Sequence, residues 1–468
     1  MEAGRARTLT LVAAILASGI ALLDATIVNV ALPAIRDDLG GGLAGQQWVV
    51  NAYLLTLGSL LLVGGSLGDL YGQRRVFWIG VAGFGLASVL CAVAPTIETL
   101  VAARALQGAA SALLTPASLA VISEVYDDPG ERGAAIGTWT AWGGIAAVVG
   151  PFAGGLLIDL AGWRWIFLVN VPLVLLTLLL IRACVPPLEG RAAPRLDLVG
   201  AALCALGLAA PVLALIEQPS RGWGDPLVAG GLAGGALLLV AFVGWERRAR
   251  PPMLPLGLFR RRNFAWANAE TLLVYAALSA LFFFLVIFLQ EQAGWPALEA
   301  GLAGVPVTVV LFALSSRVGA LSQRYGPRLF MGSGPIVAGL GLLPLLRLDA
   351  TPSYVVDVLP AMVLFGLGLT LTVAPLTATV MAAAGHGDAG AASGVNNAVA
   401  RVAGLLGIAA IGVAVAGSGA TGVDVDGFRT GMALTAALLV AGGLLGFAGI
   451  RNPRVARVEP PVVSSAPR

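Results

Sequence analysis

Long runs of apolar residues, separated by short polar segments, recur along the whole chain. A helix that crosses a bilayer needs about 20 predominantly apolar residues, and these runs reach that length. The pattern therefore predicts an all-α membrane protein with fourteen membrane helices. We place them at 9–35, 46–67, 76–94, 98–123, 133–160, 165–183, 196–216, 227–245, 265–290, 298–321, 329–347, 355–383, 390–417 and 429–449.

The composition agrees with a membrane protein. Of the 468 residues, 58% are hydrophobic and only 11% are charged, whereas a soluble domain carries about 25% charged residues. The formal net charge of +3 does not suggest nucleic-acid binding, and all 28 basic residues are arginine. The three cysteines show no CxxC spacing, so neither a metal site nor a disulfide framework is predicted.

The arginines indicate the orientation of the helices. Cytoplasmic loops of membrane proteins carry an excess of Lys and Arg. With the N-terminus inside, most arginines fall in cytoplasmic segments, including Arg5, Arg7 and the cluster at Arg247 and Arg248. We therefore expect a multi-pass protein of the cell inner (plasma) membrane, with both termini in the cytoplasm.

The polar segments divide the chain into three membrane parts and a tail. Residues 1–183 are expected to form a six-helix bundle, and residues 264–450 a second one. Between them, residues 184–263 hold two additional helices flanked by cytoplasmic linkers. Residues 451–468, rich in Pro, Ser and Arg, are expected to form a cytoplasmic tail.

A charged, glycine-rich hairpin occurs twice in the chain. It runs from Gly65 to Arg75, between two apolar segments, and a similar pattern returns from Gly319 to Arg328. One hairpin used twice suggests two similar halves. Alternating-access transporters are commonly built from such repeats.

Several motifs, taken in order, resemble those of the major facilitator superfamily, specifically its fourteen-helix drug:proton antiporter branch. The resemblance covers nearly the whole chain and implies two six-helix bundles plus two linker helices. It is carried by the following segments: Leu23–Pro33 in the first helix, Gly65–Arg75 as motif A, Arg104–Gly108 with Pro116 as motif B, Gly137, Gly150, Pro151, Gly154 and Gly155 as motif C, Trp163–Pro172 before the sixth helix, and Ser393–Arg401.

Asp24 and Arg104 are charged residues in the middle of apolar helices. A charge at mid-bilayer costs about 3 kcal/mol, so intramembrane charges usually mark functional sites. Asp24 could bind a proton or attract a cationic substrate, or it could merely hydrogen-bond a neighbour. Arg104 needs a partner or water because it cannot lose its proton. It could couple to an acid or form a fixed ion pair.

The first hairpin is a candidate gate. Gly65 opens this hairpin, and Gly68 and Gly72 permit a tight turn and close approach. Asp69 could pair across the two halves with an arginine or a helix N-terminus. Arg74 and Arg75 flank the turn. A passive, solvated turn is the alternative. In the second copy Gln323 replaces the acid, which makes the predicted switch asymmetric.

The fifth predicted helix carries small residues and a proline. Pro151 removes a backbone hydrogen bond and kinks a helix. Gly150 and Gly154 have the small-xxx-small spacing that lets another helix approach closely. We interpret the set Gly137, Gly150, Pro151, Gly154 and Gly155 as packing and rocking elements, with close packing alone as the alternative.

Glu270 and Arg401 are further candidates for coupling in the second half. Glu270 could be a second titrating site or an acid at the membrane interface, and Arg401 could pair with an acid or face water. Other polar and aromatic side chains in the helices could line a substrate cavity: Asn29, Trp48, Asn51, Tyr53, Gln107, Trp139, Trp142, Asn396 and Asn397.

The chain has no GxxxxGK[ST] sequence and no lysine, so transport driven by ATP is not expected. We expect no cofactor and no metal, and energy from a proton gradient. The predicted function is proton-coupled export of hydrophobic, cationic or amphipathic small molecules by a monomer. The alternatives are a narrow exporter of one endogenous metabolite or antibiotic and, from other classes, a membrane-embedded enzyme or a sensor.

Overall fold

The computed structural model describes residues 3–188, 196–250, 252–384, 389–416 and 422–452. Within these ranges the regular structure is entirely helical, and fourteen helices are long and apolar enough to cross a membrane. The predicted all-α class and the predicted number of spans are therefore confirmed. Most of the expected cytoplasmic tail, residues 453–468, lies outside the described residues.

The first part of the chain contributes α1 to α7, and two further helices follow. The bounds are α1 Ala3–Leu39, α2 Gly42–Tyr71, α3 Gln73–Ala92, α4 Ile97–Val125, α5 Pro129–Ala161, the short α6 Trp165–Leu168, α7 Asn170–Cys184, α8 Leu198–Arg221 and α9 Pro226–Glu246.

The second part contains six spans, three of which are interrupted. The bounds are α10 Arg262–Glu291, α11 Ala297–Leu302, α12 Val305–Tyr325, α13 Pro327–Gly341 followed by a 3₁₀ turn Leu343–Arg347, a π turn Tyr354–Val358 followed by α14 Leu359–Ala384, α15 Ala389–Ala416 and α16 Val425–Gly449. A 3₁₀ turn, Leu256–Arg260, precedes α10. Prolines explain two of the breaks, because Pro306 and Pro344 stand in the first turn of a new helical segment.

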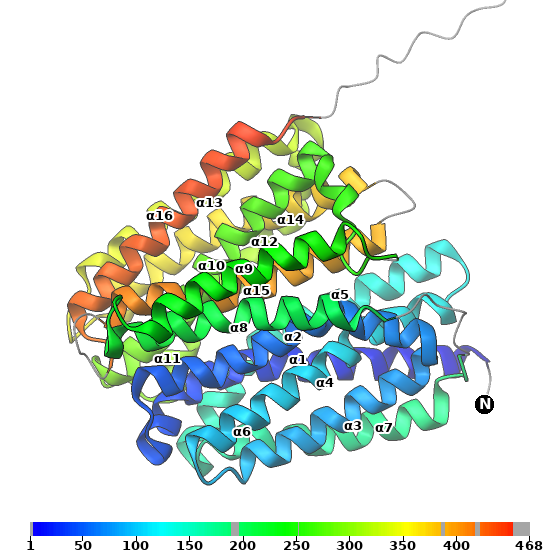
Figure 1. Ribbon diagram of the computed structural model, residues 1–468, viewed down its shortest axis with the longest axis horizontal. Coiled ribbons are helices and arrows are strands. Elements are labelled where there is room, and N and C mark those ends of the chain that lie inside the picture. The colour runs from blue at the N-terminus through cyan, green and yellow to red at the C-terminus, as the bar shows by residue number, and fades with distance from the viewer. Residues whose placement is uncertain (1–2, 189–195, 251, 385–388, 417–421, 453–468) are drawn as a thin grey trace, which may run out of the picture.

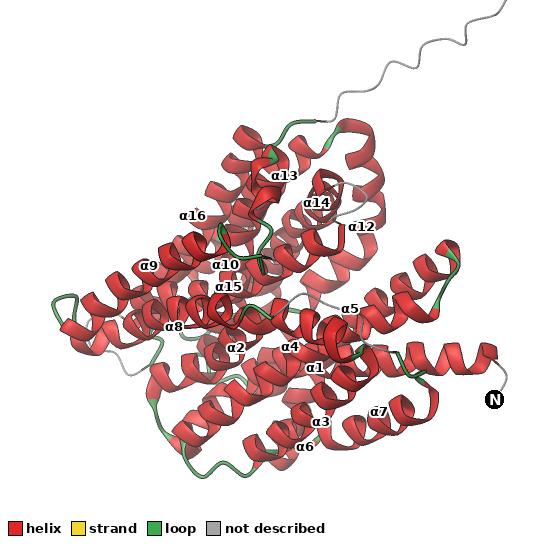
Figure 2. Ribbon diagram, turned by 45° about the vertical axis from the view of Figure 1, so that its right-hand side comes forward, coloured by secondary structure: helices red, strands yellow, loops and turns green. Residues whose placement is uncertain are grey.

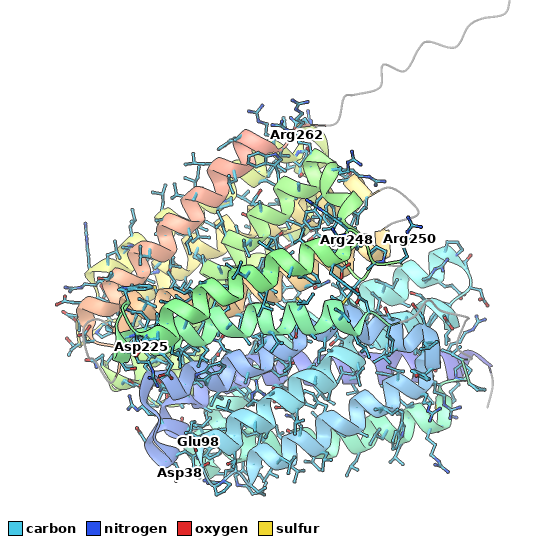
Figure 3. The ribbon with its side chains drawn as sticks, in the orientation of Figure 1. Asp38, Glu98, Asp225, Arg248, Arg250 and Arg262 are labelled. Atoms are coloured by element: carbon cyan, nitrogen blue, oxygen red, sulfur yellow. The ribbon has the colours of Figure 1, made fainter. Side chains whose placement is uncertain are left out.

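Successive spans run in opposite directions, so the bundle has two ends (Figure 1). We call the end where α1 begins the near end and the opposite end the far end. Charge differs between them in the view with side chains (Figure 3). Of the labelled residues, Arg248, Arg250 and Arg262 lie toward the near end, whereas Asp38, Glu98 and Asp225 lie at the far end.

The helices α8 and α9 pack against each other and lie along the seam between the two halves. Leu208, Val212 and Ile216 of α8 form one buried cluster with Leu405 and Ala409 of α15, and α2 contributes partly buried residues to it. The additional pair therefore contacts both halves through α2 and α15.

The two halves touch at the far end. Glu291 of α10 forms an ion pair with Arg36 of α1 and accepts a hydrogen bond of 2.8 Å from Gln46 of α2. The side chain of Gln290 donates to the carbonyl of Val30 at 2.9 Å. Toward the near end, α5 and α12 diverge (Figure 2). The molecule is therefore joined across its halves at the far end and splayed at the near end.

Candidate functional site

Asp24 is fully buried in the middle of α1 and forms an ion pair with Arg104 of α4. Their exposed side-chain fractions are 0% and 1%, and the distance from Asp24 Oδ2 to Arg104 Nη1 is 2.5 Å. A buried charge is strongly destabilising unless it is paired and hydrogen-bonded. The α1–α4 contact is therefore built around this pair.

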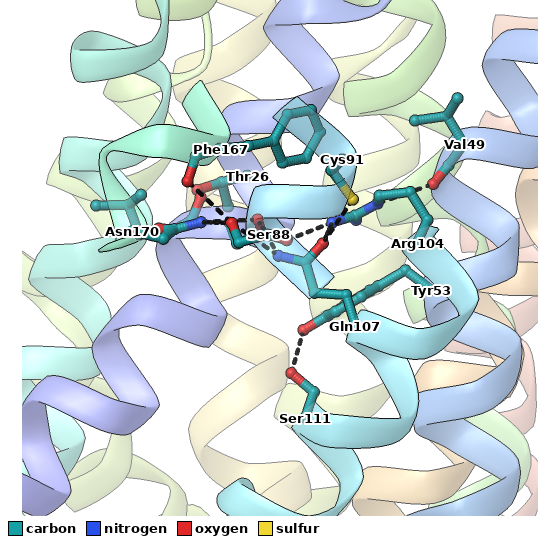
Figure 4. Close-up of polar contacts among 12 residues, drawn as sticks. Thr26, Val49, Tyr53, Ser88, Cys91, Arg104, Gln107, Ser111, Phe167 and Asn170 are labelled. Carbon is teal, nitrogen blue, oxygen red and sulfur yellow. Dashed lines mark hydrogen bonds and ion pairs between the residues drawn. The ribbon is translucent and has the colours of Figure 1, made fainter. Parts of the chain in front are cut away.

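Three neutral polar side chains complete the network (Figure 4). Gln107 Nε2 donates to Asp24 Oδ1 at 2.9 Å, and Asn170 Nδ2 donates to the same oxygen at 3.2 Å. Asn170 also donates to Ser88 at 3.0 Å, and Ser88 donates to the carbonyl of Phe167 at 2.9 Å. The carboxylate thus has a hydrogen-bond donor at both oxygens, supplied by α4 and α7.

Arg104 has further contacts besides its ion pair with Asp24. It donates to the carbonyl of Val49 at 3.1 Å and to Gln107 Oε1 at 2.6 Å. Its guanidinium lies 4.4 Å from the centre of the Tyr53 ring, a favourable cation–π distance. Gly108, in the next turn, lets α4 approach α2, because a Cβ there would collide with the backbone of Tyr53.

A cavity of about 520 Å³ lies between the two halves beside this network. Cavities of roughly 300–1,000 Å³ are typical of small-molecule sites. Its lining comes from both halves and includes Arg104 and Arg401. It also includes four of the residues proposed from the sequence as cavity candidates: Asn29, Tyr53, Asn396 and Asn397.

The other five cavity candidates lie outside the lining of this cavity. Gln107 is buried inside the polar network, and Trp48 packs against the cluster between α8 and α15. Asn51 is buried but does not line the cavity. Its side-chain amide has no hydrogen-bond partner among the described residues. Trp139 packs between α1 and α4, and Trp142 is half exposed on the surface. Helical position alone did not show which face of each helix points inward.

Glu270 lies about two turns into α10 and its side chain is completely buried in the protein. Among the described residues, neither carboxylate oxygen has a hydrogen-bond partner. Close by in sequence, Asn268 and Thr271 accept hydrogen bonds from Asn396 of α15, at 3.1 and 2.8 Å. A buried, unpartnered carboxyl in a membrane bundle is a candidate proton-binding group.

The candidate gate has its contacts within one half. Asp69 accepts a hydrogen bond of 2.9 Å from Gln73, and Arg74 donates to the carbonyl of Arg182 at 2.9 Å. Gly72 has a φ of 90°, which fits the tight turn predicted there. Within the described part of the chain, Asp69 has this contact inside its own half and none across the halves, so the possible cross-half pairing is not made in this conformation. Gly65 lies inside α2, before the turn, where it faces Pro116 of α4, and Arg75 follows the turn in α3.

The small residues of α5 divide into two groups. Gly150 and Gly154 pack on α1, where an added Cβ would collide with Thr26 or Ile27, and Gly155 packs on the backbone of Leu298 in α11. The carbonyl of Pro151 is close to Gly301, also in α11. Gly137, in contrast, is exposed, with open space around it, so it has no packing role in this conformation.

The sequence reasoning missed four residues that build the site and its closure. Ser88 and Asn170 belong to the Asp24 network, while Arg36 and Glu291 join the halves at the far end. Ser88 and Asn170 had a detectable signal, since both are polar residues inside apolar helices. Arg36 and Glu291 were not distinguishable from solvated residues at helix ends.

Comparisons with known proteins support the fold and the family. The chain is 41% identical to the puromycin resistance protein of Streptomyces alboniger, over 87% of this chain and 82% of that protein. It is 37% identical to the cephamycin export protein of Amycolatopsis lactamdurans, over 89% and 86%. The crystal structure of a bacterial homologue of the human lysosomal transporter Spinster has the same fold, with a TM-score of 0.68 at 17% identity, covering 95% of this chain and 96% of that one.

The model of the major facilitator superfamily matches residues 14–408. This range includes the Asp24–Arg104 network, the cavity and the additional helices α8 and α9. The chain belongs to the major facilitator superfamily of membrane transporters, and its fourteen spans agree with the drug:proton antiporter branch that its motifs resemble.

Proposed function

We propose that the protein is a proton-coupled exporter that works by alternating access. The observation that carries this proposal is the buried Asp24–Arg104 pair, which adjoins a cavity formed by both halves. An acid at this position can exchange a proton while the cavity exchanges substrate. The protein would work as a monomer, without a metal or cofactor. The proton gradient would supply the energy for transport. Transport, not catalysis, would then be the activity.

The near end is proposed to face the cytoplasm. The arginines at this end follow the bias of cytoplasmic loops. Both termini would then be cytoplasmic, in the bacterial plasma membrane. With the halves joined at the far end, the structure corresponds to a state that is open toward the cytoplasm.

Proton uptake at Asp24 requires that its bond to Arg104 breaks. In the conformation described here the pair is intact and both oxygens of Asp24 accept hydrogen bonds. Opening at the far end would separate the two halves there and admit water from outside to the pair. Asp24 would then take up a proton. When the protein returns to the cytoplasm-open state, Asp24 would release that proton.

Glu270 is proposed as a second proton-binding group, in the other half of the molecule. Neither of its carboxylate oxygens has a hydrogen-bond partner among the described residues. A carboxyl in each half would allow proton binding to be linked to movement of the halves. Asp69 would form its contact across the halves only when the near end closes.

The substrate is proposed to be a hydrophobic or amphipathic small molecule. The relatives named above are a puromycin resistance protein and a cephamycin export protein. Their names support two possibilities for this chain, a broad drug exporter and a narrow exporter that protects a producer from its own antibiotic. A panel of compounds in the same flux assay separates them.

Inside-out vesicles containing the protein test the proposal. After a proton gradient is imposed, adding a transported compound from this panel should dissipate it, and Asp24→Asn should abolish that response. Asp37→Asn is the matched control, since Asp37 is an exposed acid on the same helix. Gradient dissipation that is undiminished in Asp24→Asn would remove Asp24 from the mechanism.

A further inference from the structure

The charged groups that line the central cavity are all of one sign. Among the described residues, Arg104 and Arg401 line it, and no Asp or Glu does. Arg104 is already neutralised by Asp24, which lies behind it and is fully buried. Arg401 therefore determines the charge that a bound molecule meets.

Arg401 is held at the wall of the cavity by close packing of its helix. It lies on α15 where this helix meets α2, and an added Cβ at Gly58 of α2 would be 3.3 Å from Arg401 Cβ. Within the described part of the chain, no carboxylate forms an ion pair with Arg401. A guanidinium always carries its charge and offers five donors, so it is suited to binding an anion.

The walls around Arg401 combine further polar groups with apolar surface. Tyr275 and Ser279 of α10 and Asn397 of α15 lie in the same lining. Apolar side chains such as Leu54 and Phe282 make up much of the remaining wall. This arrangement suits a molecule with an apolar ring system and one acidic group.

We propose that the cavity binds amphipathic organic anions, with a carboxylate or phenolate at Arg401 and the apolar body against the facing walls. This inference rests on the proposed export function and names its substrate class. It differs from the cationic substrates expected from the sequence. A cation in this cavity would meet an uncompensated positive charge, in surroundings where charges interact more strongly than in water.

Two dyes that share the xanthene ring system but differ in charge test this proposal. Fluorescein is an anion at pH 7.5 and rhodamine 6G is a cation. Binding of each to the purified full-length protein is measured by fluorescence anisotropy, in wild type, Arg401→Gln and Arg401→Lys. Arg221→Gln is the control, because Arg221 is at the exposed end of α8 and does not line the cavity.

Fluorescein should bind wild type at least tenfold more tightly than rhodamine 6G. Arg401→Gln should weaken fluorescein binding at least tenfold, whereas Arg401→Lys should retain most of it and Arg221→Gln all of it. Preference of wild type for rhodamine 6G, binding of neither dye, or equal fluorescein binding by Arg401→Gln would overturn the proposal. Because binding is measured without a proton gradient, such a result leaves the separate test of proton coupling unaffected.

Discussion

At the scale of single residues, the buried pair of Asp24 and Arg104 is the most constrained feature of the protein. Both side chains are almost inaccessible to solvent and each has further hydrogen-bond partners. Removing one member of a buried pair is far more damaging than removing both, because it leaves an unpaired charge. The pair is thus a structural requirement as well as the proposed coupling site.

This asymmetry can be measured. Arg104→Gln alone should lower the free energy of unfolding by about 3–5 kcal/mol, because Asp24 loses its partner. The double variant Asp24→Asn/Arg104→Gln should be more stable than Arg104→Gln, since no buried charge remains. Thermal melting of the two purified variants in detergent makes the comparison. A double variant that melts below Arg104→Gln would contradict the described pairing.

Glu270 should behave in the opposite way to Asp24. It has no hydrogen-bond partner to lose among the described residues, so Glu270→Gln removes a titratable group without leaving a charge unpaired. We expect its melting temperature to equal or exceed that of wild type, while proton-coupled transport falls at least tenfold. Vesicle flux and thermal melting on the same preparation provide both values. Unchanged transport would exclude Glu270 from coupling.

The sequence predicted Asp24 and Arg104 as functional because a charge in an apolar membrane helix is costly and usually marks a functional site. It could not predict that the two residues are partners, since they are 80 positions apart and meet only when α1 packs on α4. Trp48 and Trp142 show the same limit of the sequence, because both were cavity candidates and neither lines the cavity. Their orientation depends on helix rotation, which the apolar pattern of a membrane helix barely specifies.

At the scale of elements, α5 shows where small residues matter. An added methyl at Gly154 would collide with Ile27 of α1, whereas Gly137 on the same helix has open space around it. Overpacking typically costs about 1–3 kcal/mol. In a helix exposed on one side, replacing Gly by Ala instead gains up to about 1 kcal/mol.

Gly154→Ala should therefore lower the melting temperature, and Gly137→Ala should leave it unchanged or raise it. The two variants make the same chemical change on one helix, so differences in helix propensity cancel. If both variants were equally stable, the tight α1–α5 contact would not be present in the protein.

Hydropathy predicted the elements well because each span must satisfy its backbone hydrogen bonds within the membrane. Spans predicted as continuous at 298–321, 329–347 and 355–383 are interrupted in the structure. The first break, around Gly304, lies beside Phe282 of α10, so packing between elements contributes to it as well as Pro306. Average hydropathy cannot detect such a local change of backbone.

At the scale of the whole molecule, the contacts of Glu291 hold the far ends of the two halves together. Glu291 contacts Arg36 and Gln46, both from the first half. Hydrogen bonds to charged groups are worth about 1.5–3 kcal/mol. Loss of the Glu291 contacts should therefore shift the equilibrium from the state that is open at the near end toward the state that is open at the far end.

Glu291→Gln should increase the population in which the far end is open. Spin labels at Glu98 and Ala350, which are exposed near this end in different halves, would report a longer distance in more molecules. Asp37→Asn is the control, since Asp37 contacts Arg36 within α1 and does not bridge the halves. An unchanged distance distribution in Glu291→Gln would show that these contacts do not keep the far end closed.

The repeated hairpin predicted two halves, and its residues predicted a gate, but the sequence contains no information on which conformation is adopted. Asp69 has the chemistry for a contact across the halves, yet it bonds Gln73 here. Which contact Asp69 makes depends on how the two halves are tilted relative to each other as rigid units. Such a tilt is a property of the entire assembly.

The central claim is that Asp24 couples proton movement to transport and is not simply part of the substrate site. Proteoliposomes containing Asp24→Asn can be tested for two activities with a labelled compound that wild type transports: uptake driven by a proton gradient, and exchange between equal concentrations on the two sides. We predict that driven uptake is lost while exchange continues near the wild-type rate. Driven uptake at the wild-type rate in Asp24→Asn would contradict the account.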